Sequence, residues 1–105
     1  MYKLYIAGKI TGDPYYVDKF CKAEIALHNV GYTVLTPAIL PEGMRPIDYM
    51  RICLAMLETA DGVALLDDWQ SSAGAQIEKS TADYIGRPTK LVRQWIDMME
   101  ERKDE

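Results

Sequence analysis

The sequence predicts an α/β protein with a single domain over residues 1–105, in which helices cover both faces of a doubly wound parallel sheet of four to five strands. This three-layer arrangement is typical of flavodoxin-like and Rossmann-like folds. Two observations lead to it. Short apolar segments alternate along the chain with longer segments of helical periodicity, an order that requires crossovers between parallel strands. Residues 62–66 (GVALL) are apolar throughout, as expected of a central strand covered on both faces.

The N-terminal segment contains the first strand and the first helix. Lys3–Ala7 is a short apolar run that ends at Gly8, which indicates a buried strand. Asp13 as N-cap and Pro14 as the first helical residue are a favoured helix start. Apolar side chains then recur at helical spacing over residues 16–30, so one face of this helix is expected to lie on the core.

A second strand and a second helix follow. Gly31 suits the left-handed conformation that ends many helices, and residues 32–36 are β-branched and aromatic, as is typical of a strand. Residues 37–46 hold three prolines and one glycine and are expected to form a loop. Pro46 can open the next helix, whose apolar side is formed by Met50, Cys53, Leu54 and Leu57.

The second half of the chain adds two more strands, each followed by a helix. After the central strand, a helix is expected over residues 73–85, with Gly86 and Pro88 at its end. Residues 89–92 are expected to form a last short strand, and residues 93–105 a C-terminal helix with a charged end. The core-facing stripe of the third helix is expected to be Ile77, Thr81, Tyr84 and Ile85.

Composition and charge exclude several classes of function. With 16 acidic against 12 basic residues, a net charge of −4 and no basic stripe, the chain is not expected to bind nucleic acid. No apolar run reaches the roughly 18 residues of a membrane-spanning helix, and the N-terminus lacks the features of a signal peptide. Cys21 and Cys53 lie far apart without metal-binding spacing, which favours free thiols in a reducing cytoplasm over a disulfide or a zinc site.

The predicted fold places a ligand site at the carboxyl ends of the strands. Three loops lie there, at residues 8–13, 36–46 and 67–74. The rule for open α/β sheets therefore nominates these three loops as the place of the site, the crevice outside the strand ends.

The first of these loops is marked by glycines and polar residues. Gly8 and Gly12 allow backbone N–H groups to approach an anion at the start of a helix. Lys9 would supply a positive charge to a phosphate, and Thr11 lies in the same loop. Because the spacing matches neither common phosphate-binding motif, an ordinary turn with a solvated lysine is an equal alternative.

The loop after the central strand is richer, and it contains Asp67, Asp68, Trp69, Ser72 and Gly74. Trp69 can stack on a planar base at the mouth of a pocket, or it can cover the core. Asp67 and Asp68 can orient a ligand hydroxyl or a proton donor, or act as turn residues. Ser72 can cap the next helix or donate a hydrogen bond to a ligand.

Two further side chains, Glu78 and Tyr5, each have two interpretations. Glu78 lies one step round the helix from the expected core stripe, so it can face solvent or the crevice, and solvated glutamates are the more common case. The helix macrodipole favours its ionised form. Tyr5 is either a core aromatic or a side chain directed at the crevice. His28, the only histidine, has no evident Ser, Asp or Cys partner, so no catalytic triad is expected.

Three segments together resemble a known superfamily. They are YIAGKITG at the first strand, GYTVLTPA at the second, and ADGVALLDDWQSSAGAQIEKSTADYIGRP at the third strand and its helix. They are similar to the nucleoside 2-deoxyribosyltransferase superfamily, which includes the 2'-deoxynucleoside 5'-phosphate N-hydrolases. Within it, a small and often phage-encoded branch with a tryptophan loop and an S-x-GA-x-x-E helix is the most similar. The resemblance covers the chain from Tyr2 to about Val92.

The resemblance implies a nucleoside or nucleotide as the small-molecule partner and assigns roles to most of these residues. Glu78 is implied to be the nucleophile and Tyr5 its positioning partner. At the base end, next to Trp69, Asp67 or the catalytic candidate Asp68 would donate or position the proton for the departing base. The sugar or phosphate end is implied to consist of Gly8, Lys9, Thr11, Gly12, Ser72 and Gly74. No metal or organic cofactor is implied. Members of the superfamily form dimers or larger assemblies, often with a neighbouring subunit at the site.

The sequence also departs from the superfamily pattern. Relatives carry an Arg-Asp pair on the helix before the third strand, whereas here Arg51 is followed by Ile52. Asp48 lies one turn earlier and is a candidate replacement, and Gln76 stands where many relatives have a glycine. The alternative to an enzyme is therefore a nucleotide-binding module that retains the pocket and has lost the chemistry.

Overall fold

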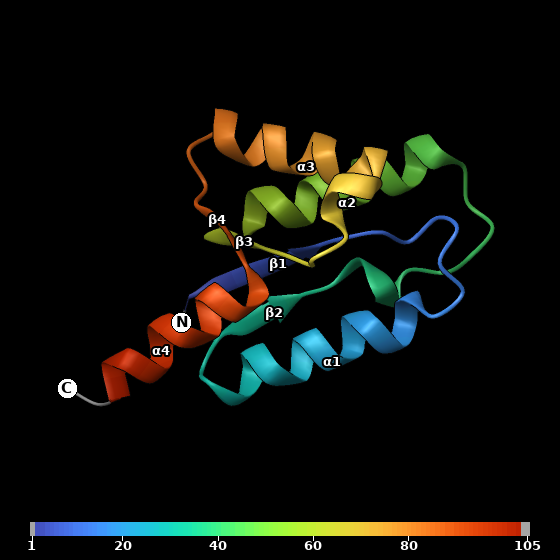
Figure 1. Ribbon diagram of the computed structural model, residues 1–105. Coiled ribbons are helices and arrows are strands. Elements are labelled where there is room, and N and C mark those ends of the chain that lie inside the picture. The colour runs from blue at the N-terminus through green and yellow to red at the C-terminus, as the bar shows by residue number, and fades with distance from the viewer. Residues whose placement is uncertain (1, 104–105) are drawn as a thin grey trace.

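A four-stranded parallel sheet forms the centre of the computed structural model, which describes residues 2–103 (Figure 1). Its strand order is β2-β1-β3-β4, and every neighbouring pair is parallel. The strands are β1 (Lys3–Ala7), β2 (Thr33–Leu35), β3 (Gly62–Leu65) and β4 (Thr89–Leu91). This architecture confirms the predicted doubly wound α/β fold.

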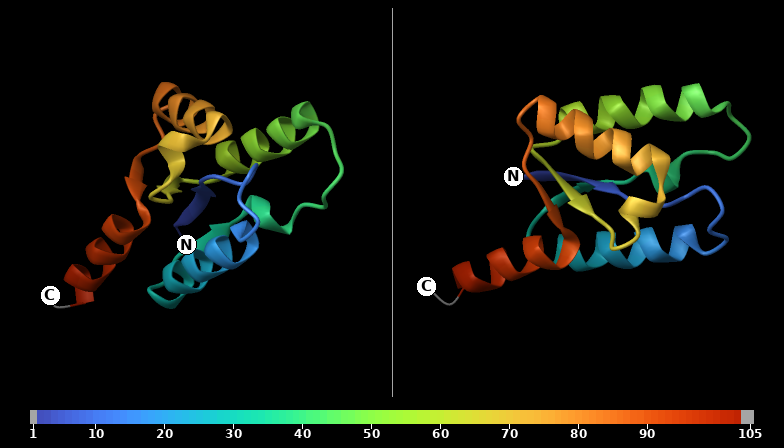
Figure 2. Two further views of the ribbon diagram at one scale, coloured as in Figure 1. Left: turned by 45° about the vertical axis from the view of Figure 1, so that its right-hand side comes forward. Right: turned by 45° about the horizontal axis from the view of Figure 1, so that its top comes forward.

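Four helices form the outer layers, with α1 and α4 on one face of the sheet and α2 and α3 on the other (Figure 2). They are α1 (Tyr16–Asn29), α2 (Pro46–Thr59), α3 (Ala73–Tyr84) and α4 (Val92–Lys103). Two short 3-10 helices, η1 (Pro37–Ile39) and η2 (Trp69–Ser71), follow β2 and β3. None of the helices in residues 2–103 has the length and apolar character needed to cross a membrane.

Side chains along β1 alternate between the two layers, because successive residues of a strand point to opposite faces. Leu4 and Ile6 pack in the core under α1 and α4. Tyr5 and Ala7 pack in the core under α2 and α3. This alternation places Tyr5 in the same layer as α3.

The chain reverses its direction of winding between the two central strands. From β1 it continues to α1 on one face, and from β3 it continues to α3 on the other. The segments that follow the two strands are in close contact. A Cβ built on Gly8 would lie only 2.5 Å from the Leu66 side chain. The crevice expected at such a reversal therefore opens directly beyond Gly8.

Helix α1 begins two residues later than the sequence predicts. The carboxylate of Asp13 accepts a hydrogen bond from the Tyr15 N–H at 2.9 Å, which forms a turn before the first helical residue, Tyr16. Pro14 is therefore part of this turn rather than the first residue of the helix. Gly31 ends the helix with a φ of 109°, as expected.

The buried face of α3 differs from the predicted stripe. The residues that this helix buries are Ala75, Glu78 and Ala82, whereas Ile77 is 49% exposed and Tyr84 92% exposed. The alanines allow α3 to lie close to the sheet, and the Glu78 carboxylate finds a hydrogen-bond donor there. An apolar stripe at helical spacing was therefore not the core face of this helix.

Candidate active site

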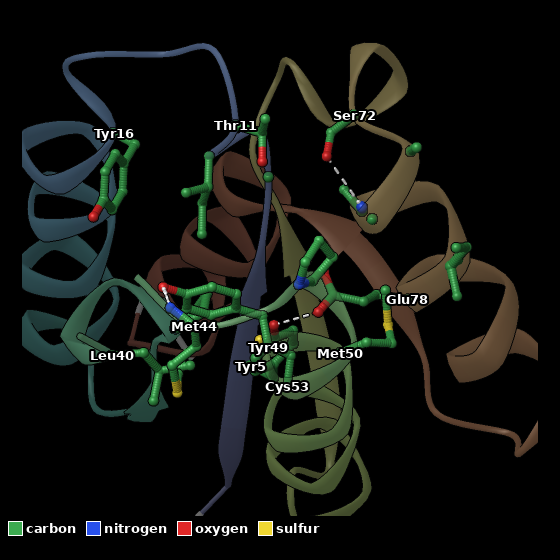
Figure 3. A pocket seen from close by; sticks show the side chains of 18 of the residues that line it. Tyr5, Thr11, Tyr16, Leu40, Met44, Tyr49, Met50, Cys53, Ser72 and Glu78 are labelled. Atoms are coloured by element: carbon green, nitrogen blue, oxygen red, sulfur yellow. Dashed lines mark hydrogen bonds between the residues drawn. The ribbon is translucent and has the colours of Figure 1, made fainter. Parts of the chain in front are cut away.

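A cavity of about 790 Å³ lies at the carboxyl ends of the strands, on the α2–α3 side of the sheet (Figure 3). All three loops that the sequence nominates contribute to its walls, together with the first turns of α2 and α3. The volume is within the range of sites for small organic molecules, about 300–1,000 Å³. The predicted location of the ligand site thus coincides with a cavity of suitable size.

The structure brings together about half of the predicted site residues. Those that line the cavity are Tyr5, Gly8, Thr11, Ser72, Gly74 and Glu78. Those that do not are Lys9, Gly12, Asp67, Asp68 and Trp69. Apart from Tyr5 on β1 and Gly74 and Glu78 on α3, both groups come from the loops that follow β1 and β3, so neighbouring residues of one loop differ in whether they reach the cavity.

Glu78 and Tyr5 form a buried pair at the inner end of the cavity. Glu78, in the second turn of α3, is 6% exposed, and the ring of Tyr5 is fully buried in the centre of the sheet. The Tyr5 hydroxyl donates a hydrogen bond to Oε2 of Glu78 (Figure 3). Tyr5 comes from a strand that is paired on both sides, so its backbone is held by the sheet.

Burial determines the protonation of this pair. It raises the pKa of Glu78 to about 7, and the hydrogen bond from Tyr5 partly opposes the rise. Burial, reinforced by the charge of Glu78, also raises the pKa of Tyr5, so the phenol keeps its proton and remains a donor. The neighbouring Cys53 thiol has its pKa raised by burial too. Glu78 is therefore the one group of this trio that changes charge near neutral pH.

The raised pKa of Glu78 predicts an unusual pH dependence of stability. Between its ordinary pKa of 4.5 and about 7, the folded chain holds a proton that the unfolded chain has released. The free energy of unfolding should therefore fall as pH rises through this window, by about 3 kcal/mol in total, and then level off. Chemical denaturation of wild type and Glu78→Gln at about pH 5 and pH 8 measures the difference.

In this comparison Glu78→Gln is the reference for wild type, because every other carboxylate is present in both proteins. Bonds to Lys19 and to the Tyr15 N–H lower the pKa of Asp13, and the bond from the Lys3 N–H lowers that of Asp61, in both proteins alike. Their contribution cancels in the difference. Parallel stability curves for the two proteins would contradict a raised pKa at Glu78.

The start of α3 forms one polar edge of the cavity. Ser72 is the N-cap, and its Oγ accepts a hydrogen bond from the Ala75 N–H at 3.2 Å. A Cβ built on Gly74 would meet no atom closer than 4.0 Å, so this edge is open rather than crowded. Thr11 lies at the same end of the cavity in Figure 3.

The opposite wall is largely apolar, and the sequence did not single out its residues. It includes Leu40 and Met44 from the loop before α2, and Tyr49 from the helix itself. The Tyr49 hydroxyl donates to the Pro41 carbonyl at 2.6 Å and accepts from the Met44 N–H at 3.3 Å, so it fixes the shape of this loop. The sequence signal that could have indicated this wall is a tyrosine in the first turn of a helix that follows a proline-rich loop.

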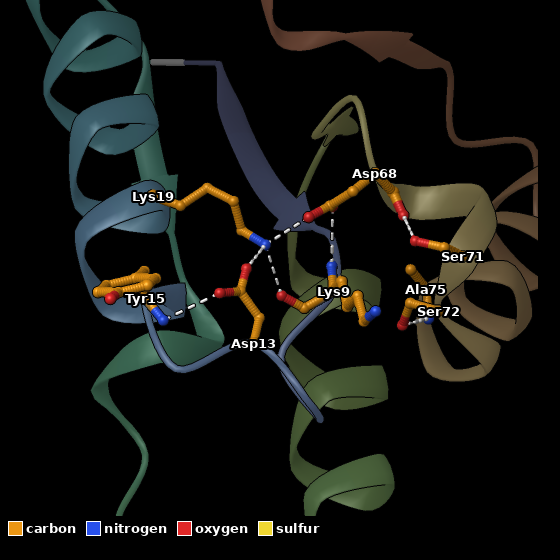
Figure 4. Close-up of polar contacts among 8 residues, drawn as sticks. All are labelled: Lys9, Asp13, Tyr15, Lys19, Asp68, Ser71, Ser72 and Ala75. Carbon is orange, nitrogen blue, oxygen red and sulfur yellow. Dashed lines mark hydrogen bonds and ion pairs between the residues drawn. The ribbon is translucent and has the colours of Figure 1, made fainter.

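The polar residues that miss the cavity form other bonds. Both carboxylate oxygens of Asp68 are engaged, one by the Lys9 N–H at 3.0 Å and the other by the Lys19 ammonium (Figure 4). Asp67 points away and pairs with Arg93 at 2.9 Å on the exposed surface. Neither carboxylate is directed at the cavity.

Trp69 and Gly12 have structural positions. Trp69 packs against the core under α2 and α3, with the Lys79 ammonium 5.7 Å from the centre of its ring. Gly12 has a φ of 84°, a conformation that a side chain disfavours, and it shapes the turn after β1. Both positions match the structural alternatives that the sequence left open.

Asp48 does not direct its carboxylate into the cavity. It accepts from the Arg45 backbone N–H at 3.2 Å and from the Arg45 guanidinium at 3.1 Å, which caps the start of α2. Arg51 is exposed. The carboxylate that is absent at Ile52 is therefore not replaced by its neighbour one turn earlier. Within the described part of the chain, no group of three or more potential ligand side chains could hold a metal ion.

Comparisons with known proteins identify a family and a similar fold. Residues 2–90 match a family model described as a domain of unknown function, DUF4406. A solved structure of a 2-deoxyribosyltransferase from the psychrotolerant bacterium Bacillus psychrosaccharolyticus is similar in fold, with a TM-score of 0.67. The two are 23% identical, over 85% of this chain and 70% of that one, a likeness that shows the fold alone. No curated protein matches the sequence.

Proposed function

The chain belongs to the DUF4406 family, and from this premise we propose that it is an enzyme that cleaves or transfers at the N-glycosidic bond of a 2'-deoxynucleoside or its 5'-monophosphate. The observation that carries the proposal is the buried Glu78 carboxylate, held by Tyr5 at the inner end of a cavity of small-molecule size. The fold likeness to a 2-deoxyribosyltransferase and the sequence resemblance to that superfamily support it. The narrower resemblance to a phage-encoded branch stays a prediction.

The first chemical step is attack by Glu78 on the anomeric carbon of the sugar. A bond forms between C1' and a carboxylate oxygen, and the bond between C1' and the base nitrogen breaks. The base leaves with the electron pair and takes up a proton from water. The ionised form of Glu78 is required. Burial raises its pKa to about 7, which lowers the ionised fraction but still leaves a large share of the active form near neutral pH. Poor solvation makes this carboxylate a stronger nucleophile.

The second step resolves the sugar ester. Water attacks C1' in hydrolysis, or the nitrogen of a second base attacks it in transfer, and either step restores the Glu78 carboxylate. Tyr5 positions the carboxylate in both steps, since its hydroxyl holds one oxygen and leaves the other to react. The same geometry serves both outcomes.

The two ends of the cavity suit the two ends of a nucleoside. The apolar wall of Leu40, Met44 and Tyr49 offers a surface for a planar base. The opposite edge, with Thr11 and Ser72, offers hydroxyl groups to the sugar or a 5'-phosphate. We place the sugar against the start of α3, where the absence of a side chain at Gly74 leaves room.

Release of free base tests the proposal. Wild-type protein is incubated with a panel of 2'-deoxynucleosides and their 5'-monophosphates, with and without a second base, and products are separated by chromatography. Release of base from at least one deoxy substrate, with the corresponding ribonucleoside cleaved more slowly, is expected. No release from any member at high enzyme concentration would exclude the enzyme.

A binding module without catalysis is the second candidate. Ile52 and the engagement of Asp48 with Arg45 favour it, because the carboxylate that relatives use near the leaving base has no replacement at that place. It predicts a rise in melting temperature with nucleotides and no base release. The enzyme predicts both.

The exposed stripe on α3 supports a homo-oligomer. Ile77 and Tyr84 of α3 and Ile85, which follows it directly, are exposed, and Ile77 also lines the cavity. We propose that a second copy covers this stripe, so that Tyr84→Glu shifts the mass measured by light scattering to that of a monomer. The unbridged thiols of Cys21 and Cys53 fit the cytoplasmic location that we propose.

A further inference from the structure

An ammonium group outside the cavity connects two loops that shape it. Lys19, in the first turns of α1, directs its Nζ at three oxygens: the Lys9 carbonyl at 2.8 Å, Oδ2 of Asp13 at 2.6 Å and Oδ2 of Asp68 (Figure 4). The second oxygen of Asp68 accepts the Lys9 N–H at 3.0 Å. All three protons of the ammonium thus have an acceptor.

These bonds join segments that are distant in sequence. Lys9, Asp13 and Lys19 belong to the segment that follows β1, whereas Asp68 belongs to the loop that follows β3. Two residues after Lys9 comes Thr11, and four residues after Asp68 comes Ser72, and both line the cavity. The bonds therefore connect the two loops that bring Thr11 and Ser72 to the polar edge of the cavity.

The group is built more firmly than a surface ion pair. The side chains of Lys19, Asp13 and Asp68 are 26%, 22% and 30% exposed, so water screens their attraction only in part. One ammonium serves two carboxylates, and backbone groups complete the set. Geometry held by several partly buried charges in a network is more persistent than that of a single exposed pair.

We propose that Lys19 and Asp68 are positioning residues, whose ion pair holds the β1–α1 loop and the β3–α3 loop at the spacing that a bound nucleoside requires. This inference rests on the proposed function for its substrate. Asp68 acts through its bonds to Lys19 and Lys9, and not as a proton donor, because both of its oxygens are occupied outside the cavity. Tyr5 and Glu78 sit on β1 and α3 and are not held by this network, so substrate binding depends on it and the chemical step does not.

Two variants and a matched control test the proposal. Lys19→Met removes the ammonium but keeps the apolar stem, and Asp68→Asn keeps the acceptor for the Lys9 N–H but removes the charge. Lys22→Met is the control, since Lys22 lies on the same helix and, among residues 2–103, forms an ion pair only with the exposed Asp18 at 3.0 Å. Lys19→Arg restores a cation.

Hydrogen exchange of the unliganded protein is the first measurement. Amides of residues 8–15 and 66–72 are expected to exchange faster in Lys19→Met and Asp68→Asn than in wild type or Lys22→Met. This readout needs no substrate, so it remains valid if no nucleoside is cleaved. Unchanged exchange in both variants would overturn the proposal.

Kinetics is the second measurement. KM for base release should rise between roughly tenfold and a hundredfold in both variants, with kcat within about threefold of wild type, since a small displacement of binding groups weakens positioning. The double variant should cost no more than either single variant, and Lys19→Arg should recover most of the loss. A fall in kcat at unchanged KM, or additive effects, would overturn the positioning role.

Discussion

Glu78→Gln is expected to reduce base release by roughly 10⁴-fold or more, a typical result of removing an enzyme's nucleophile. The amide has nearly the shape of the carboxylate but cannot form the sugar ester. The loss should appear in kcat, because the residues proposed to hold the base and the sugar are unchanged. At the same time the variant should be more stable than wild type above about pH 7, since the buried charge is gone.

Two measurements separate this result from general damage. Quenched reactions of wild type, digested and analysed by mass spectrometry, should show a deoxyribosyl adduct on the peptide that contains Glu78 and none in the variant. Glu42→Gln tests the other carboxylate that lines the cavity. If Glu42→Gln loses as much kcat as Glu78→Gln, or if the adduct is found on Glu42, the nucleophile is wrongly assigned.

Tyr5→Phe is expected to lower the rate at neutral pH by about 10–100-fold, equivalent to the 1.5–3 kcal/mol of a hydrogen bond to a charged group. The Tyr5 hydroxyl lowers the pKa of Glu78, so its removal raises that pKa further. The rate should therefore begin to rise at a higher pH than in wild type. Part of the lost activity should return when the assay pH is increased.

The pH profile of kcat/KM distinguishes this role from a structural one. Tyr49→Phe is the matched comparison, because it removes a hydroxyl from the same cavity that contacts Pro41 and Met44 instead of Glu78. It should alter KM and leave the position of the acid limb unchanged. An acid limb that does not move in Tyr5→Phe would show that the hydroxyl has no influence on the nucleophile.

The topology and the general location of the site could be predicted from the sequence for a physical reason. Alternating apolar and helical periods require parallel strands with crossovers, and the reversal of winding then fixes where loops converge. The placement of Glu78 was harder, because a helical pattern gives spacing but not the direction of the core. Ile77 and Tyr84 have the composition of a buried stripe, yet Ala75 and Ala82 are the residues small enough to let α3 approach the sheet.

The direction of side chains within a loop was the second feature that could not be predicted from the sequence. Asp67, Asp68 and Trp69 follow the central strand at its carboxyl end, as Ser72 does. Sequence position alone could not show that Ser72 lines the cavity and these three residues do not. Their partners decide where they point: Arg93 for Asp67, Lys19 for Asp68, and the core under α2 and α3 for Trp69. Each partner lies far away in sequence or is fixed only by tertiary packing, so no local pattern could reveal it.

In the proposed function, the loop held by the Tyr49 hydroxyl contacts the base and is separate from the residues that react with the sugar. The surface that we propose for the base consists of Leu40, Met44 and Tyr49, whereas Tyr5 and Glu78 belong to a central strand and to another helix. Substitutions or insertions in this one segment can therefore change which base is accepted without moving the reacting groups. Within the DUF4406 family, divergence in substrate range should concentrate in the segment between η1 and α2, and an exchange of that segment between two members should transfer base preference.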